Sequence, residues 1–176
     1  SSPADVKGLL LAAFRSNSPT FFLTHAKLLG IEGPVEEGFY TTPFGQAEVK
    51  RAGRDVTIVA TSYMVVVALQ AAEILAKEGI EAEVVDPRTL TPFDEATLLA
   101  SLERTGRLVV VDECPLRCGV AAEITAAMVE KGFKFLKAAP VRVTRPDVPI
   151  PFSTPIEDEL TPDAAKVVAA VRRLLG

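Results

Sequence analysis

The chain has 176 residues, 48% of them hydrophobic, and a formal net charge of −4 at pH 7. This length suits one domain, or one domain with a fragment of another, and the apolar content allows a substantial buried core. The acidic balance and the lack of a Lys/Arg run argue against a nucleic-acid surface, and no apolar run is long enough to cross a bilayer. We therefore expect neither nucleic acid nor a membrane as a partner.

The first 50 residues predict one helix, one short strand and a linker. Ser2 can cap a helix and Pro3 suits its first position, so we expect a helix that runs through Phe14. The β-rich run 20–24 follows, and residues 25–50 contain Gly, Pro and acidic residues without clear periodicity. Because the sequence begins on a helix cap without an initiator Met, we expect it to be a piece of a longer protein.

From residue 51 to residue 176 the sequence predicts a second unit in which strands and helices alternate. The third strand is almost continuously apolar, as expected of a strand that is covered on both faces. Such alternation is typical of an α/β fold, here a three-layer domain with a parallel sheet between helices and right-handed crossovers. The expected strands span 56–61, 82–86, 108–112 and 141–144, and the expected helices span 65–77, 94–103, 119–131 and 161–176.

A proline-rich segment separates the last strand from the last helix. Residues 140–162 contain six prolines, Pro140 and Pro162 included. Each fixes φ and lacks an N–H donor, so the segment is expected to be neither helix nor central strand. Acidic residues 157–159 predict a solvated edge or a docking site for a basic partner. The apolar residues of the segment favour an ordered extended strap packed on another part of the protein: Val148, Ile150, Phe152 and Ile156.

Few side chains indicate chemistry by themselves. His25 is the only histidine, and no motif supplies the orienting partner that a catalytic base needs, so a structural role is favoured. Cys114 and Cys118 have the wrong spacing for a redox Cys-x-x-Cys pair and lack the neighbours of a zinc site. Two reduced cysteines without a disulfide framework are typical of the cytoplasm, which is the location that we expect.

Two loops are better candidates for binding. The loop before Gly119 joins a central strand to a helix at the carboxyl edge of the sheet, where ligands usually bind, so it is the expected pocket. Arg88 follows the second strand of the unit and is expected either to bind a carboxylate or phosphate or to hold its own loop through Asp86. No dinucleotide fingerprint and no phosphate-binding Gly-Lys-Ser/Thr loop is present.

Three motifs together resemble one family. These are Asp86-Pro-Arg-Thr-Leu-Thr-Pro-Phe-Asp94, Gly119-Val-Ala-Ala-Glu-Ile124 and the proline-rich segment from Arg142 to Glu157. They resemble signature segments of the beta subunit of thiamin-diphosphate-dependent 2-oxo acid dehydrogenases, and the resemblance covers essentially the whole chain. The Cys-Pro-Leu-Arg-Cys loop is similar to the acetoin dehydrogenase branch.

The resemblance implies two domains and a division of labour. Residues 1–50 are similar to the last helix and strand of a thiamin pyrimidine-binding domain, and residues 51–176 resemble the complete transketolase C-terminal-like domain. The family's cofactor-activating Glu and catalytic His belong upstream, so no catalytic or cofactor-binding residue is expected in this chain. With thiamin diphosphate and Mg²⁺, the implied parent enzyme decarboxylates a 2-oxo acid, or cleaves acetoin, and passes the acyl group to a lipoyl arm. The piece alone is expected to bind no cofactor and to be inactive.

The resemblance also implies partners and two kinds of site. The expected partners are an alpha subunit, a second beta subunit in a heterotetramer, and the dihydrolipoyl acyltransferase core of a multienzyme complex. Contact with that core is expected at Lys137 and at the terminal carboxylate of Gly176. Lys137 stands where the family has Asp, and such a charge reversal alters partner choice. A structural potassium ion is expected on backbone carbonyls at the end of the first helix: Ala13, Phe14, Ser16 and Ser18.

Two other functions stay open from the residues. One is the C-terminal domain of a transketolase or of a deoxyxylulose-phosphate synthase, although the proline-rich segment favours the beta subunits. The other is a stand-alone binding module of flavodoxin-like topology, which requires residues 1–50 to fold alone around a core.

Overall fold

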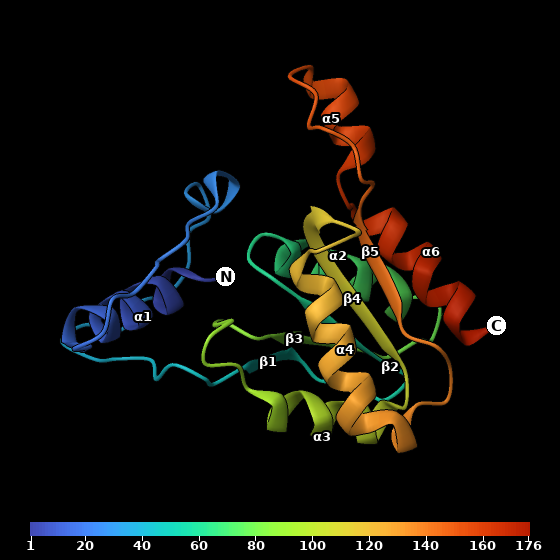
Figure 1. The fold of residues 1–176 in the computed structure, drawn as a ribbon, viewed down its shortest axis with the longest axis horizontal. Coiled ribbons are helices and arrows are strands. Elements are labelled where there is room, and N and C mark those ends of the chain that lie inside the picture. The colour runs from blue at the N-terminus through green and yellow to red at the C-terminus, as the bar shows by residue number, and fades with distance from the viewer.

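The computed structural model describes all 176 residues and centres on one five-stranded sheet (Figure 1). The strand order is β1-β3-β2-β4-β5. Strands β2 to β5 run parallel to their neighbours, whereas β1 pairs antiparallel with β3. The strands are β1 (Glu48–Arg51), β2 (Val56–Ala60), β3 (Ala82–Asp86), β4 (Leu108–Pro115) and β5 (Val141–Arg145).

The edge strand β1 corrects the expectation of a purely parallel sheet. From the sequence these residues were expected to be the end of a linker, because a short strand with three charged residues shows no alternating apolar pattern. It forms because the outer edge of β3 has N–H and C=O groups that need partners, and Glu48 and Val49 lie opposite Asp86 and Val85. The expected domain boundary after residue 50 therefore falls inside a strand.

Helices cover both faces of the sheet and confirm the three-layer α/β architecture. Helices α2 and α6 pack on one face, and α3 and α4 pack on the other (Figure 1). No helix is both long and apolar enough to span a membrane. The helices are α1 (Pro3–Arg15), α2 (Met64–Ala76), α3 (Glu95–Thr105), α4 (Val120–Gly132), α5 (Thr154–Leu160) and α6 (Ala164–Leu175), with short 3₁₀ turns η1 (Ala26–Leu28) and η2 (Phe133–Phe135).

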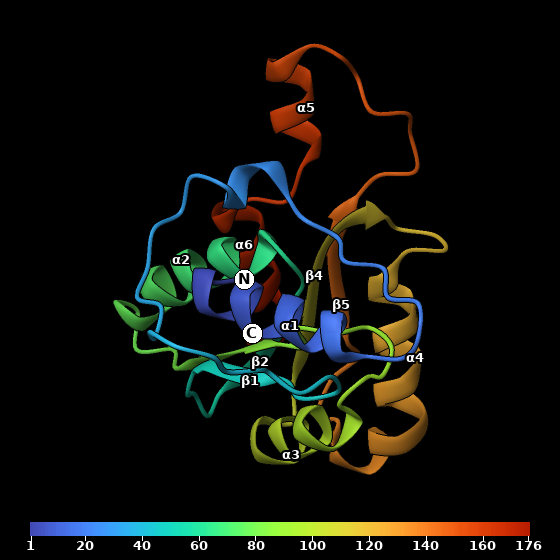
Figure 2. The ribbon, with the colours of Figure 1, turned by 90° about the vertical axis from the view of Figure 1, so that its left-hand side faces the viewer.

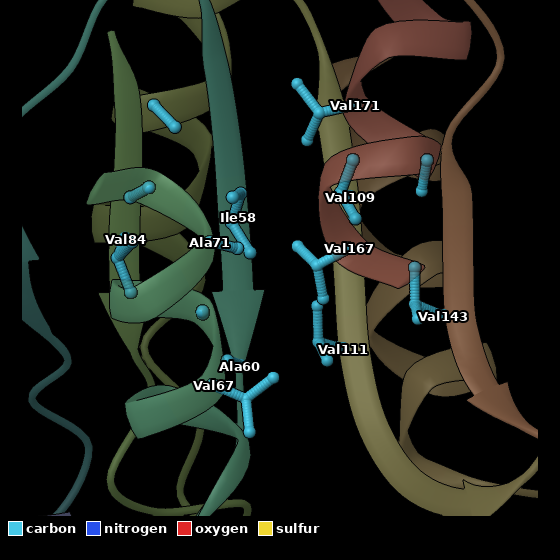
Figure 3. Packing of buried hydrophobic residues seen from close by; sticks show 14 of the residues in the cluster. Ile58, Ala60, Val67, Ala71, Val84, Val109, Val111, Val143, Val167 and Val171 are labelled. Atoms are coloured by element: carbon cyan, nitrogen blue, oxygen red, sulfur yellow. The ribbon is translucent and has the colours of Figure 1, made fainter. Parts of the chain in front are cut away.

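The core has two halves because successive strand side chains point to opposite faces. Val109 and Val111 face α2 and α6, whereas Val110 between them faces α3 and α4. Both faces of the strand are therefore buried, which explains why its sequence is continuously apolar. Figure 3 shows one half of this core, with Ile58 from β2 and Val171 from α6 among the labelled side chains.

The N-terminal piece confirms one expected element and corrects another. Helix α1 begins as expected, and the Ser2 hydroxyl accepts a hydrogen bond from the backbone N–H of Asp5 at 3.2 Å. The expected strand at 20–24 does not form, because no second strand lies beside it to pair with its backbone. Phe21 and Leu23 are accordingly 94% and 83% exposed.

The proline-rich segment also differs from its expected form. Residues 146–161, here called the arm, leave the sheet after β5, project from the body and return to α6 (Figures 1 and 2). The arm contains helix α5, which Pro155 permits because it stands in the first helical turn, where its missing N–H costs no hydrogen bond. The expected packing is absent too, since Ile150 is 58% exposed and Phe152 is fully exposed.

Candidate assembly surfaces

A cluster of four charged side chains joins α1 to the sheet. The Lys50 ammonium lies 2.9 Å from one oxygen of Asp5, and Arg88 Nε lies 3.0 Å from the other. Glu48 pairs with both cations. Burial alone raises the pKa of Asp5, but hydrogen bonds from Ser2 and Lys50 and the nearby positive charge outweigh it and hold this pKa well below its usual range. Asp5 is therefore ionised while nearly buried.

Arg88 thus has a structural partner within its own chain. One expectation was that Arg88 binds a carboxylate or phosphate. Its guanidinium group does bind carboxylates, but these belong to Asp5 and Glu48 and not to an external ligand. The backbone N–H of Arg88 donates to Asp86 at 2.9 Å, so the contact with Asp86 is made by the main chain and not, as had been expected, by the guanidinium group. Asp5 lies far from Arg88 in the sequence, so only the fold brings the two together.

His25 has the orienting partner that no sequence motif indicates. Its Nε2 lies 2.6 Å from a carboxylate oxygen of Glu113, which is 88 residues further along the chain. Its Nδ1 accepts the backbone N–H of Lys27 at 3.1 Å, and its ring stacks on Tyr63 with 5.2 Å between centroids. Both ring nitrogens are therefore occupied, and His25 fastens residues 25–28 to the carboxyl edge of the sheet. This geometry supports the expected structural role.

The loop that contains Cys114 and Cys118 carries two separate thiols. Both Cys114 and Cys118 are free. Burial and the negative charge of Asp112 raise the pKa of Cys114, so its thiol stays protonated and weakly nucleophilic at neutral pH. This loop is the expected pocket, yet none of the residues that line a cavity of about 440 Å³ belongs to it.

That cavity is a shallow groove between β5 and α6, here called the groove. Its rim is basic, with Arg142, Lys166 and Arg173. Arg142 donates to the Leu116 carbonyl at 2.7 Å. Lys166 donates to the Thr161 carbonyl at 2.6 Å and forms an ion pair with Asp163 at 3.6 Å, whereas Arg173 forms no ion pair or side-chain hydrogen bond. The other lining residues are mostly small or apolar: Val141, Val143, Thr144, Ala169 and Ala170.

The arm presents the opposite chemistry. Glu157, Asp158 and Glu159 of α5 are exposed, and their carboxylates form no ion pair in the structure. This arrangement agrees with the expected acidic edge. The apolar side chains of the arm are exposed as well: Val148, Ile150, Phe152 and Ile156.

The two residues expected to contact an acyltransferase lie at separate chain positions. Lys137 lies between η2 and β5, and its ammonium is 3.4 Å from the Thr105 carbonyl at the end of α3. A cation is favourable at this helix end, so Lys137 has a local role in addition to the expected one. Gly176 ends the chain after α6 and is exposed.

The expected potassium ligands lie at and just beyond the C-terminal end of α1. The Ala13 carbonyl accepts the N–H of Ser16 at 3.1 Å, and the Ser18 carbonyl accepts the Thr20 hydroxyl at 3.3 Å. Backbone carbonyls of this kind suit a hard cation, so the donor type fits potassium. The ligand set, which also includes Phe14, stays a prediction.

The fold now defines the class of protein. The three-layer α/β unit with one antiparallel edge strand coincides with a match of residues 45–167 to the family "Transketolase, C-terminal domain". The chain therefore belongs to this family. The match begins just before β1, which agrees with the pairing of β1 to the sheet.

Curated relatives confirm the resemblance to dehydrogenase beta subunits. The chain is 51% identical to the beta subunit of acetoin:2,6-dichlorophenolindophenol oxidoreductase from Cupriavidus necator, over 99% of this chain and 52% of that protein. It is 42% identical to the pyruvate dehydrogenase E1 component subunit beta from Bacillus subtilis, over 99% of this chain and 54% of that protein. The chain thus spans about half the length of the curated relatives that it matches.

A solved structure is similar in fold as well as in sequence. It is described as "Split gene transketolase, inactive beta4 tetramer", with a TM-score of 0.65 and 35% sequence identity. The similarity covers 85% of this chain and 52% of that one. This relative again is about twice as long as the part that matches.

Proposed function

We propose that the chain is the C-terminal part of the beta subunit of a 2-oxo acid or acetoin dehydrogenase, and that its own role is assembly. One observation carries the proposal: beta subunits of acetoin and pyruvate enzymes match this chain along 99% of its length. The exposed arm and the basic groove are surfaces suited to subunit contacts.

We place no catalytic step in these residues. Thiamin diphosphate, when bound, stabilises the carbanion left after the bond beside a substrate carbonyl breaks. The residues of this chain do not fit that cofactor, because Asp5 and Glu48 are already paired with Lys50 and Arg88, and both nitrogens of His25 are bonded. The cofactor and its Mg²⁺ are proposed to bind elsewhere in the parent enzyme, whose acyl product passes to a lipoyl group.

The proposed partners follow from the same role. They are an alpha subunit, a second beta subunit in a heterotetramer, and an acyltransferase core contacted through Lys137 and Gly176. The solved relative described as a beta4 tetramer supports self-association of such subunits. We further propose a potassium ion on the carbonyls at the end of α1 and a cytoplasmic location, which the two free cysteines support.

The experiment is reconstitution of activity. The complete reading frame that contains this sequence is expressed with its neighbouring alpha subunit, and reduction of 2,6-dichlorophenolindophenol is followed with acetoin and with pyruvate. We expect activity that needs both subunits and added thiamin diphosphate, and none from the 176-residue chain alone. Activity only as a transketolase, or saturable thiamin diphosphate binding by the isolated chain in calorimetry, would contradict the proposal.

A further inference from the structure

We propose that two copies of this chain exchange their arms, so that residues 146–161 of each copy bind in the groove between β5 and α6 of the other. The inference rests on the proposed pairing of two beta subunits and names the surfaces that carry it. Each chain has one arm and one groove. In a two-fold symmetric dimer each groove can therefore bind the arm of the other copy, so that no arm and no groove is left free.

The first argument is that the body of the chain leaves the arm uncovered. The arm projects away from the sheet in both views (Figures 1 and 2). Ile150 is 58% exposed and Phe152 is fully exposed. Several large exposed apolar side chains on one segment favour an interaction site in a soluble protein.

The second argument is the chemistry of the groove. Its floor and walls are formed by side chains such as Val141, Ala169 and Ala170, which suit the apolar residues of the arm. It also follows β5, the edge strand of the sheet, whose outer backbone groups have no partner strand. A segment bound in the groove would shield this edge.

The third argument is charge complementarity. Helix α5 carries the unpaired acids Glu157, Asp158 and Glu159, and the rim of the groove carries Arg142, Lys166 and Arg173. Arg142 and Arg173 form no ion pair within the chain, whereas Lys166 is already paired with Asp163 at 3.6 Å. The acidic helix and the two unpaired arginines of the rim are therefore opposite in charge, which favours a specific encounter between them.

The fourth argument identifies the occupant as a second copy. Both ends of the arm are anchored at the same end of the groove. The chain passes from β5 into the arm after Arg145 and continues into α6 from Ala164. From that anchor the arm projects away from β5 and α6 (Figure 1), the two elements that line its own groove. The arm of another copy approaches the groove without this restriction.

The test is a charge swap followed by sedimentation equilibrium on the chain. The arm variant is Glu157→Arg, and the groove variant is Arg173→Glu, chosen because Arg173 makes no internal ion pair that the substitution would break. We expect each single variant to raise the dimer dissociation constant about tenfold and the double variant to restore it to within about threefold. Glu130→Arg, on the exposed side of α4, is the matched control and leaves the constant unchanged.

A disulfide test locates the contact. In a background with Cys114→Ser and Cys118→Ser, Ser153→Cys on the arm and Ala169→Cys in the groove are combined. We expect a covalent dimer after oxidation for the combined variant only, with each single variant remaining monomeric on a non-reducing gel. Circular dichroism checks that every variant is folded.

Three results would overturn the inference. The first is a chain that stays monomeric at high protein concentration. The second is a dimer whose dissociation constant is unchanged by either charge reversal. The third is a variant with a single cysteine that forms as much covalent dimer as the combined variant does. The reconstitution assay is independent of them. If the full-length enzyme with a charge-reversed arm is active and its beta subunits still pair as before, arm exchange is refuted and the proposed activity is not. If the full-length enzyme exchanges its arms but is inactive, the proposed activity is refuted and arm exchange is not.

Discussion

Asp5 makes contacts both within its own helix and with residues far away in the sequence. It caps its own helix with Ser2 and lies between Lys50 of β1 and Arg88 in the loop after β3. The sequence indicates the first of these roles, since Ser-Pro-Ala-Asp is a helix start. It does not indicate the second, because the partners are 45 and more residues away.

We predict that Asp5→Asn lowers the free energy of unfolding by about 2–3 kcal/mol, measured by urea titration. Removing one partner of a buried ion pair leaves desolvated cations behind, although Glu48 still compensates part of their charge. The control is Glu130→Gln, an exposed acid on α4, which we expect to change the free energy of unfolding by less than about 0.5 kcal/mol. Equal effects would contradict the role given to the cluster.

The same carboxylates predict acid sensitivity. Hydrogen bonds and neighbouring cations depress the pKa values of Asp5 and Glu48 below those of the unfolded chain, against the opposing effect of burial. The unfolded state therefore binds more protons below about pH 4.5, and the stabilisation present at neutral pH is lost as the pH falls from there toward the folded pKa values. Urea titrations at pH 7 and pH 3 measure this loss, which should be smaller in Asp5→Asn.

At the scale of elements, the helix ends were easier to predict than the edges of the sheet. The caps of α3 and α6 are local: Asp94 accepts the N–H of Thr97 at 3.1 Å and Asp163 accepts the N–H of Lys166 at 2.7 Å. The cap of α3 was expected at Asp94, whereas the last helix was expected to begin at residue 161 and begins at Ala164. Strand β1 was missed because an edge strand is specified by its neighbour and not by its own pattern.

We predict that Asp94→Ala destabilises the protein more than Asp163→Ala does. Loss of an N-cap costs about 1 kcal/mol, and Asp94 also accepts the N–H of Ala47 at 2.9 Å, just before β1. Its replacement thus weakens both α3 and the start of the edge strand, for a total of about 2 kcal/mol. Thermal unfolding of both variants provides the comparison, and a larger effect from Asp163→Ala would be inconsistent with it.

At the scale of the whole molecule, the core lies entirely in the second part of the chain. Both halves of the core consist of buried residues from Val56 onward. The N-terminal piece contacts this body through the Asp5 cluster and through His25 and Glu113. It therefore adds polar contacts to a core that is already complete.

Two deletions separate the body from the N-terminal piece. We predict that residues 44–176 still unfold in one cooperative urea transition, because the core and β1 are retained. Deletion of residues 1–50 removes most of β1 and unpairs the edge of β3, so it should cost at least about 2 kcal/mol more. Equal stability of the two products would place the boundary after residue 50, as the sequence alone suggested.

The sequence by itself determined the alternation of strands and helices, the buried strands and the family. These features are local or periodic, so runs such as 108–112 and caps such as Asp94 carry them without reference to distant residues. Only the tertiary structure decided that Asp5 meets Arg88, that His25 meets Glu113, that β1 completes the sheet and that the arm projects from it. Each of these depends on groups far apart in the chain, and their pairing is fixed by where the packed sheet puts them.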